Sequence, residues 1–202
     1  MERWATFDCY GTLVDWNAGI AAALGDASLL ERYHELEPQV QAEQPVRSYR
    51  DVLRETARSL GVDADPAASL PEWPVFPDVP EALGEARARG WKLAILSNSD
   101  RDLIEASMRA IGVPFELAIV ASEIGSYKPG HEHWHAFARE VGRLPDVHVA
   151  QSHFHDVVPA TVLGVPNVWI NRLAETGEPP PTRELPTLAG LADTLDELVP
   201  AR

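Results

Sequence analysis

The stretch from Thr6 to Trp16 constrains the fold of this chain more than any other. A short apolar run from Trp4 to Phe7 predicts a buried strand, and this run ends on the carboxylate of Asp8. Gly11 and Thr12 follow at once as a turn, which puts Asp8 at the carboxyl end of the strand, where open α/β sheets bind ligands. Burying a carboxylate there costs free energy unless cations or N–H groups meet it. Asp8 therefore either caps the turn or takes part in chemistry.

Strand-like and helix-like segments alternate along the rest of the chain. Apolar runs predict strands at 91–96, 117–121, 147–151 and 165–170, and helical patterning predicts helices at about 78–89, 101–111, 130–141, 157–163 and 188–198. Alternation at these lengths demands parallel pairing with right-handed crossovers. The predicted fold class is α/β, with a Rossmann-like parallel sheet of about five or six strands flanked by helices. The segment 175–186, with Pro179-Pro180-Pro181, is predicted to be a surface loop or an extended tether.

One long segment, 14–74, interrupts this alternation with helical patterning only. The helical stretches run from Ile20 to Leu24, from Leu29 to Val40 and from Tyr49 to Leu60. Gly61 and a polar loop close the last of them. The sequence therefore predicts an all-helical insertion directly after the first strand.

Composition narrows the class of protein. A chain of 202 residues with 45% hydrophobic content can bury one substantial core and a small satellite domain. A net charge of −14 argues against nucleic acid as a partner, because phosphate binders present clustered Lys and Arg. The single cysteine, Cys9, excludes an internal disulfide and suits the cytoplasm. No apolar stretch is as long as a membrane span, and the polar start predicts no signal peptide, so no membrane partner is expected.

Three further polar motifs each follow an apolar run of their own. They are Ser97-Asn98-Ser99, Lys128-Pro129 and Asp156. In this order and spacing after Asp8 they resemble the haloacid dehalogenase superfamily, whose members use an Asp nucleophile, a Ser or Thr, a Lys and an acidic loop. Asp8-Cys-Tyr-Gly-Thr is similar to the Asp-x-Tyr-Gly-Thr of the type II 2-haloacid dehalogenases.

The resemblance implies a cap domain. Residues 1–13 and 75–202 would form a Rossmann-like catalytic core, and residues 14–74 a helical cap that closes over Asp8 and excludes water. The family uses a cap arginine to receive the departing halide. Arg32 falls closest to that position, with Arg47 and Arg50 as rivals.

The resemblance also implies roles for four catalytic residues. Asp8 would be the nucleophile that forms a covalent ester, which water later cleaves. Thr12 would bond one carboxylate oxygen and leave the other free to attack. Lys128 would keep Asp8 ionised, and Asp156 would orient Lys128 or help to position the hydrolytic water.

Substrate contacts are expected from the same motifs. Ser97 and Asn98, at the start of a loop before a helix, can donate to a bound carboxylate, although a plain N-cap role accounts for them equally well. Tyr10 stands where superfamily phosphotransferases place a second Asp, and a phenol is poorly matched to protonating an alkoxide at neutral pH. Its ring is expected to line the interface with the cap.

Three residues depart from the dehalogenase pattern. Gln151 and His153 stand where the Ser-Ser-Asn-x-x-Asp motif has Ser and Asn, and Trp134 stands where Tyr is usual after the Lys-Pro motif. His153 and Trp134 are predicted to contact the substrate, and His153 or His155 can act as a base because a histidine pKa lies near neutrality. The residues that match the family's nucleophile and its neighbours are all present, so we expect these three departures to affect which substrate is bound.

Three functions remain open from the sequence. The leading hypothesis is a cofactor-free hydrolase of a small anionic substrate, a short 2-haloacid, resembling the (S)-2-haloacid dehalogenases. The alternative is a magnesium-dependent small-molecule phosphatase, with Asp8, Tyr10 and Asp156 around the metal. The third is a non-catalytic protein that binds a small acid. The sequence leaves a homodimer open.

Overall fold

The computed structural model describes residues 2–43 and 47–201. Within them, six strands form one parallel sheet in the order β3-β2-β1-β4-β5-β6. The strands are β1 (Arg3–Phe7), β2 (Trp91–Ser97), β3 (Leu117–Val120), β4 (Val147–Ala150), β5 (Asn167–Ile170) and β6 (Arg183–Leu185). Both the predicted α/β class and the parallel sheet are confirmed.

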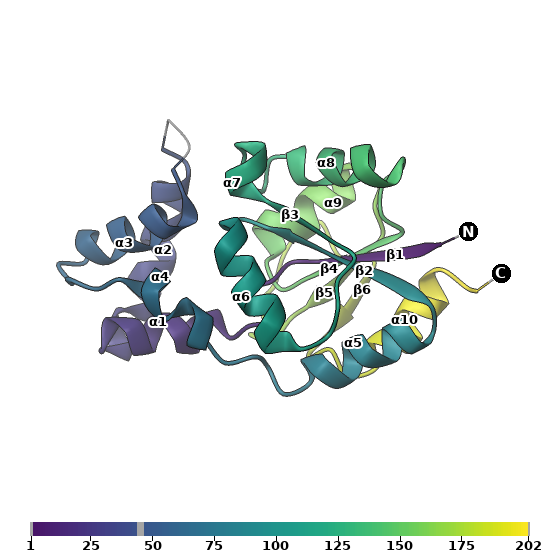
Figure 1. Ribbon diagram of the computed structural model, residues 1–202, viewed down its shortest axis with the longest axis horizontal. Coiled ribbons are helices and arrows are strands. Elements are labelled where there is room, and N and C mark those ends of the chain that lie inside the picture. Colours follow the sequence, from purple (N-terminus) through teal and green to yellow (C-terminus); the bar gives the residue numbers. More distant parts are fainter. Residues whose placement is uncertain (1, 44–46, 202) are drawn as a thin grey trace.

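Helices cover both faces of the sheet (Figure 1). On one face, α5 (Val79–Ala88), α6 (Arg101–Ile111) and α10 (Leu191–Leu198) contribute buried side chains to the larger core. On the other face, α8 (Glu132–Val141) and α9 (Val158–Val162) do the same for a second cluster. Strands that are buried on both faces must be apolar throughout, which explains why they read as continuous hydrophobic runs.

The site follows from the position of β1. This strand lies between β2 and β4, with Phe7 opposite Ile95 on one side and Val149 on the other. The chain order reverses at this point, so a crevice opens beyond the carboxyl ends of β1 and β4. Gly11 turns the chain there with a φ of +87°, and a Cβ at Gly11 would lie 3.0 Å from Gln151 Oε1. The turn after β1 therefore requires glycine.

A helical insertion between β1 and β2 forms the predicted cap, which lies beside the core in Figure 1. Its elements are α1 (Trp16–Leu24), η1 (Ala27–Leu29), α2 (Leu30–Gln41), α3 (Tyr49–Ser59), α4 (Pro66–Ser69) and η2 (Leu70–Glu72). Asp100, at the start of α6, accepts hydrogen bonds from the backbone N–H groups of Tyr49 and Arg50, both at 3.0 Å. A core carboxylate therefore caps α3 and ties the cap to the core. The boundaries 14–74 stay a prediction.

The predicted helices and strands match the observed ones closely, with one correction. The segment 175–186 is not only a loop, because Arg183–Leu185 forms β6 at the sheet edge and pairs with β5. A three-residue edge strand with exposed Arg183 and Glu184 lacks the apolar run that marks the other strands. The short helix α7 (Ala121–Ile124) follows β3 directly. None of the described helices is both long and apolar enough to cross a membrane.

Packing inside the cap gives a first prediction. Gly19 lies in α1 against Trp73, and a Cβ there would lie 2.2 Å from the Trp73 ring. We expect Gly19→Ala to destabilise the protein by about 1–3 kcal/mol in chemical denaturation, because the indole has to move out of a packed position. Gly84→Ala in α5 is the matched control, since its Cβ would meet nothing within 4 Å and should be neutral or stabilising by up to about 1 kcal/mol. Equal stability changes for the two variants would contradict this packing.

Candidate active site

The Lys128 ammonium is the centre of a buried polar cluster. Its side chain is 1% exposed, and Nζ donates to Asp8 Oδ1 at 2.8 Å and to Asp156 Oδ1 at 2.6 Å. The third donation goes to the Leu96 carbonyl at 2.8 Å. An ammonium has three N–H donors, so these acceptors satisfy all of them. One lysine thereby joins the ends of β1 and β2 to the turn η3 (His153–Val157) after β4.

The Asp8 carboxylate is held from both sides. Lys128 donates to Oδ1, and the Thr12 hydroxyl donates to Oδ2 at 2.9 Å. Thr12 is fixed in turn because its hydroxyl accepts the backbone N–H of Gln151 at 2.8 Å. Among the described residues, the Asp8 side chain accepts the Thr12 hydroxyl of its own turn and the Lys128 ammonium, and no backbone N–H of the turn. Its orientation is set by groups from three separate segments.

Asp156 is held by a partner that the sequence did not predict. His148, in the middle of β4, lies with Nε2 at 2.9 Å from Asp156 Oδ1, and its Nδ1 lies 2.8 Å from the Thr6 hydroxyl. The other oxygen of Asp156, Oδ2, is buried and has no hydrogen-bond partner among the described groups. A histidine within the apolar run Val147–Ala150 was the available signal, because a polar side chain in a buried strand needs a partner.

The charges of the cluster depend on one another. Burial, together with the Asp156 charge, raises the pKa of Asp8 above its usual range, although the Lys128 ammonium and the Thr12 hydroxyl act in the opposite direction. For Asp156, the Lys128 charge and the His148 hydrogen bond outweigh burial and hold its pKa well below the usual range. The two carboxylates likewise outweigh burial at Lys128 and raise its pKa. The Lys128 ammonium lies between the two carboxyl groups and favours the ionised form of both.

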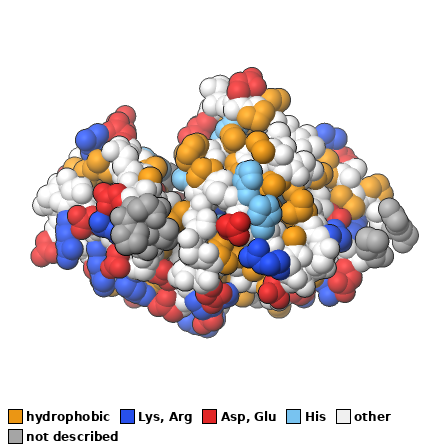
Figure 2. Space-filling view, turned by 90° about the horizontal axis from the view of Figure 1, so that it is seen from above, with side chains coloured by type: hydrophobic (Ala, Val, Ile, Leu, Met, Phe, Trp, Pro, Cys, Tyr) orange, Lys and Arg blue, Asp and Glu red, His pale blue; other side chains and the backbone are white. Residues whose placement is uncertain are grey.

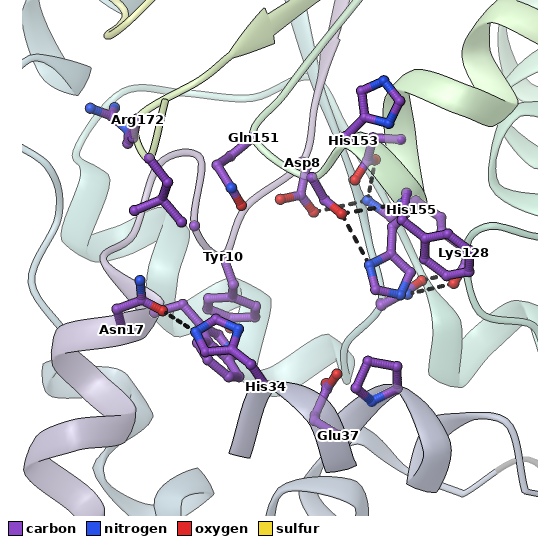
Figure 3. Close-up of a pocket in the computed structure, with 18 of the residues that line it drawn as sticks. Asp8, Tyr10, Asn17, His34, Glu37, Lys128, Gln151, His153, His155 and Arg172 are labelled. Carbon is purple, nitrogen blue, oxygen red and sulfur yellow. Dashed lines mark hydrogen bonds and ion pairs between the residues drawn. The ribbon is translucent and has the colours of Figure 1, made fainter. Parts of the chain in front are cut away.

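A cavity of about 970 Å³ opens over Asp8 and is lined by both core and cap. Figure 3 shows Asp8, His155 and Lys128 on the core side, with His34 and Glu37 pointing toward them from α2. Seen from above in Figure 2, the molecular outline is notched between the cap and the core. The exposed side chains of Phe154 and Leu173 also border the cavity.

A family model for haloacid dehalogenase-like hydrolases matches residues 3–150. The chain belongs to this family.

The curated relatives include both dehalogenases and a phosphatase. An (S)-2-haloacid dehalogenase from Pseudomonas sp. is 32% identical over 63% of this chain, and a phosphoserine phosphatase from Thermus thermophilus is 28% identical over 66% of it. Each alignment spans 59% of the relative's own length. The solved L-2-haloacid dehalogenase from Xanthobacter autotrophicus superposes with a TM-score of 0.78 at 22% identity, covering 96% of this chain and 98% of that one. This likeness shows a shared fold.

The structure brings most of the predicted site residues of this haloacid dehalogenase-like chain together. Asp8, Thr12, Lys128 and Asp156 form the cluster described above, and Tyr10, Ser97, Asn98 and His153 line the cavity. The Asn98 amide is already engaged, because it donates to the Lys128 carbonyl at 3.0 Å and accepts the Lys128 N–H at 2.6 Å. Asn98 thus shapes the loop that presents Lys128. His153 lies with Nε2 at 3.0 Å from the Pro179 carbonyl.

Two predicted substrate contacts do not reach the cavity. The Arg32 side chain is 60% exposed and pairs with Glu35 on the outer face of α2. Trp134 is fully buried in the second core cluster, edge-on to His148 at 5.2 Å. Helical periodicity explains both placements, because neither position lies on the face of its helix that is turned to the cavity.

The two other arginines considered for the halide contact also form ion pairs outside the cavity. Arg47 pairs with Glu43 at 2.6 Å and Arg50 pairs with Asp102 at 2.6 Å, and neither lines the cavity. Tyr10 turns its hydroxyl toward Ser107 at 3.1 Å and stacks on Tyr49, so its ring lies at the interface with the cap.

Several cavity residues were missed by sequence reasoning. Arg172 follows β5, pairs with Asp78 at 2.9 Å and stacks 3.8 Å over Phe76. His34, with Nε2 at 2.9 Å from Asn17 Oδ1, enters from the cap. The cap residue His34 was missed because the cap contains no strand whose end would mark a site. Which face of each cap helix is turned to the cavity depends on how the helices pack on the core.

The buried ammonium gives a second prediction. Lys128→Met leaves two buried carboxylates without their cation, and we expect a loss of about 3–5 kcal/mol in the free energy of unfolding near pH 7. The carboxyl groups of the variant have raised folded-state pKa values, so they protonate in the folded state above about pH 4. The loss therefore shrinks as the pH falls toward about 4, the pKa of these groups in the unfolded chain. Denaturant titrations at several pH values measure this.

The control is Lys92→Met, the other lysine of the chain, which pairs with Glu2 at the surface. Its effect should stay below about 1 kcal/mol at every pH. A Lys128→Met loss that is independent of pH would contradict the ion-pair cluster.

Proposed function

We propose that this chain is a hydrolase of the 2-haloacid dehalogenase type, in which Asp8 displaces halide from a 2-haloacid and forms an aspartyl ester. One observation supports this most. The Asp8 carboxylate is fixed between Lys128 and Thr12 at the carboxyl end of β1, and it faces a cavity that the helical cap covers. A carboxylate that is held in place beside an ammonium, at the wall of a cavity between core and cap, is positioned to attack a carbon atom.

In the first step an Asp8 oxygen attacks the carbon that bears the halogen, from the side opposite the halogen. The oxygen–carbon bond forms as the carbon–halogen bond breaks, and the bonding electron pair leaves with the halide. The configuration of the carbon is inverted. The Ser97 hydroxyl, at the end of β2 and on the cavity wall, is the proposed contact of the substrate carboxylate.

In the second step water attacks the carbonyl carbon of the ester. The products are a 2-hydroxy acid, a proton and free Asp8. Burial lowers the pKa of His155 to about 4, so its imidazole is neutral near pH 7 and is the proposed proton acceptor beside Lys128 and Asp156. Its Nδ1 lies 3.1 Å from the Ser152 hydroxyl, which fixes the ring.

The residues present fit magnesium poorly. Both Asp8 oxygens already accept hydrogen bonds, and the Lys128 ammonium lies between Asp8 and Asp156. Tyr10 offers no acid there because its hydroxyl turns toward Ser107. The described part of the chain holds no group of three or more His, Cys, Asp or Glu side chains placed to bind a metal. We therefore propose a cofactor-free reaction, and the cytoplasmic location and a homodimer stay predictions from the sequence.

The nucleophile can be tested by isotope labelling. With enzyme in excess over a 2-halopropionate in ¹⁸O-water, the first turnover should put label into Asp8 and leave it out of the product, because the product oxygen comes from the carboxylate. Asp8→Asn should fold normally and lose halide release by a factor of at least about 10³.

Asp63→Asn, a change at an exposed acid of the cap, is the matched control and should retain full activity. Label that enters the product directly in the first turnover would show attack by water and remove the ester mechanism.

A chelator separates this proposal from a phosphatase. Halide release should be unchanged in excess EDTA, and turnover of an aryl phosphate should stay negligible with or without magnesium. Phosphate release that needs magnesium and stops with EDTA, without any halide release, would instead favour the phosphatase alternative.

A further inference from the structure

A carboxyl group lies on the cap wall of the cavity. Glu37, on α2, is 7% exposed and lines the same cavity as Asp8. Figure 3 shows its side chain pointing across the cavity toward the side that holds Asp8 and His155. Two carboxylates that face one cavity repel each other unless one of them binds a proton.

Hydrogen bonds fix Glu37 to the core. Gln41 Nε2 donates to Glu37 Oε1, and Gln41 Oε1 accepts from Asn98 Nδ2 at 3.3 Å. Asn98 in turn holds the backbone of Lys128. Within the described residues no group donates to Glu37 Oε2, so the proton of the neutral acid can stay on Oε2 and face the cavity.

The charge state of Glu37 changes near neutrality. Burial raises its pKa to about 7, against a smaller opposite effect of the Gln41 hydrogen bond. The titratable or charged side chains that line this cavity are Asp8, Tyr10, Lys128, His153, His155, Asp156, Arg172 and Glu175 from the core, and Asp15, His34 and Tyr49 from the cap. Tyr33 and Tyr127 also lie near Glu37.

Burial raises the pKa of Asp8, whereas the other neighbours with shifted pKa values are shifted away from neutrality. Burial lowers the pKa values of His34 and His155 and raises those of Tyr33, Tyr49 and Tyr127. The Asp156 pKa is lowered and the Lys128 pKa is raised by their mutual attraction.

No cap cation is available for a departing anion within the described part of the cavity wall. The Lys and Arg side chains on that wall are Lys128, engaged by two carboxylates, and Arg172, engaged by Asp78. Arg32 pairs with Glu35 on the outside of the same helix that carries Glu37.

We propose that Glu37, as a neutral carboxylic acid, is the catalytic residue that donates a hydrogen bond to the departing halide. The proposal rests on the proposed function and names the group at the leaving-atom end of the same site. As the Asp8 oxygen–carbon bond forms and the carbon–halogen bond breaks, the halide takes the electron pair. The proton stays on Glu37 and is shared with the halide in a hydrogen bond. A deprotonated Glu37 repels the halide, so the reaction slows as the pH rises.

The pH dependence of kcat for halide release tests this role. The wild-type rate should fall by about tenfold per pH unit above the Glu37 pKa. Glu37→Gln keeps an N–H donor, so it should stay within about tenfold of the wild-type rate at about pH 6 and should lose the decline at high pH. Glu37→Leu has no donor and should lose about 10²-fold or more at every pH, with the largest loss for 2-fluoropropionate because fluoride accepts hydrogen bonds most strongly.

Glu35→Gln is the matched control, because Glu35 is an exposed acid on the same helix, paired with Arg32. It should retain the wild-type profile, and denaturation curves of all variants verify folding. A wild-type rate that stays flat up to about pH 9, or a Glu37→Gln variant that keeps the decline, would overturn the proposal.

Bromide soaked into crystals gives a readout that needs no turnover. Anomalous scattering should show bromide in contact with the Glu37 carboxyl at about pH 5.5 and not at about pH 9, whereas Glu37→Gln should bind it at both. Halide release with no dependence on Glu37 and no bromide there would leave the proposed function standing and remove this inference. Bromide bound at Glu37 without any halide release would support the anion site at Glu37 and contradict the proposed dehalogenase function.

Discussion

The pairing of one buried ammonium with two carboxylates underlies this structure. Lys128 lies 2.8 Å from Asp8 and 2.6 Å from Asp156, with all three side chains almost completely shielded from water. Isolated charges at this depth would each cost several kcal/mol, so the three are tolerable only together. The sheet supplies the placement, because the crevice beyond β1 and β4 is where their loops converge. Architecture and chemistry thus depend on the same contact.

The cap completes the site and changes its character. Asp100 caps α3, and the chain of hydrogen bonds from Glu37 through Gln41 and Asn98 reaches the Lys128 loop. Closure of the cap therefore places a second carboxyl opposite Asp8 while both remain tied to the core. Acidic side chains lie on both walls of this cavity, and its Lys and Arg side chains are already in ion pairs. An anionic group that binds at the cap end is therefore repelled unless a neutral donor contacts it. Neutral donors are the groups that can contact a departing anion there.

The sequence predicted the parts of the molecule that local patterns determine. Apolar runs that end in a polar residue and a turn identified the strands, and the resemblance of the motifs to those of the superfamily implied that Lys128 and Asp156 lie beside Asp8, as the structure shows. Sequence patterns did not predict the features that depend on how separate elements pack against each other. Arg32 and Glu37 lie on one helix, and which of them faces the cavity depends on how α2 packs. β6 was not predicted because an edge strand of three residues needs no apolar run. The role of His148 was not predicted because a single histidine in a strand does not indicate which residue it contacts.

The most direct test of the central claim is the ionisation of Asp8, measured by ¹³C NMR of its side-chain carboxyl as a function of pH. The account predicts a carboxylate at neutral pH in the wild-type protein, and a rise of at least about 2 pH units in its titration midpoint in Lys128→Met. An Asp8 that is protonated at neutral pH in the wild type, or that titrates at the same pH without the ammonium, would contradict it.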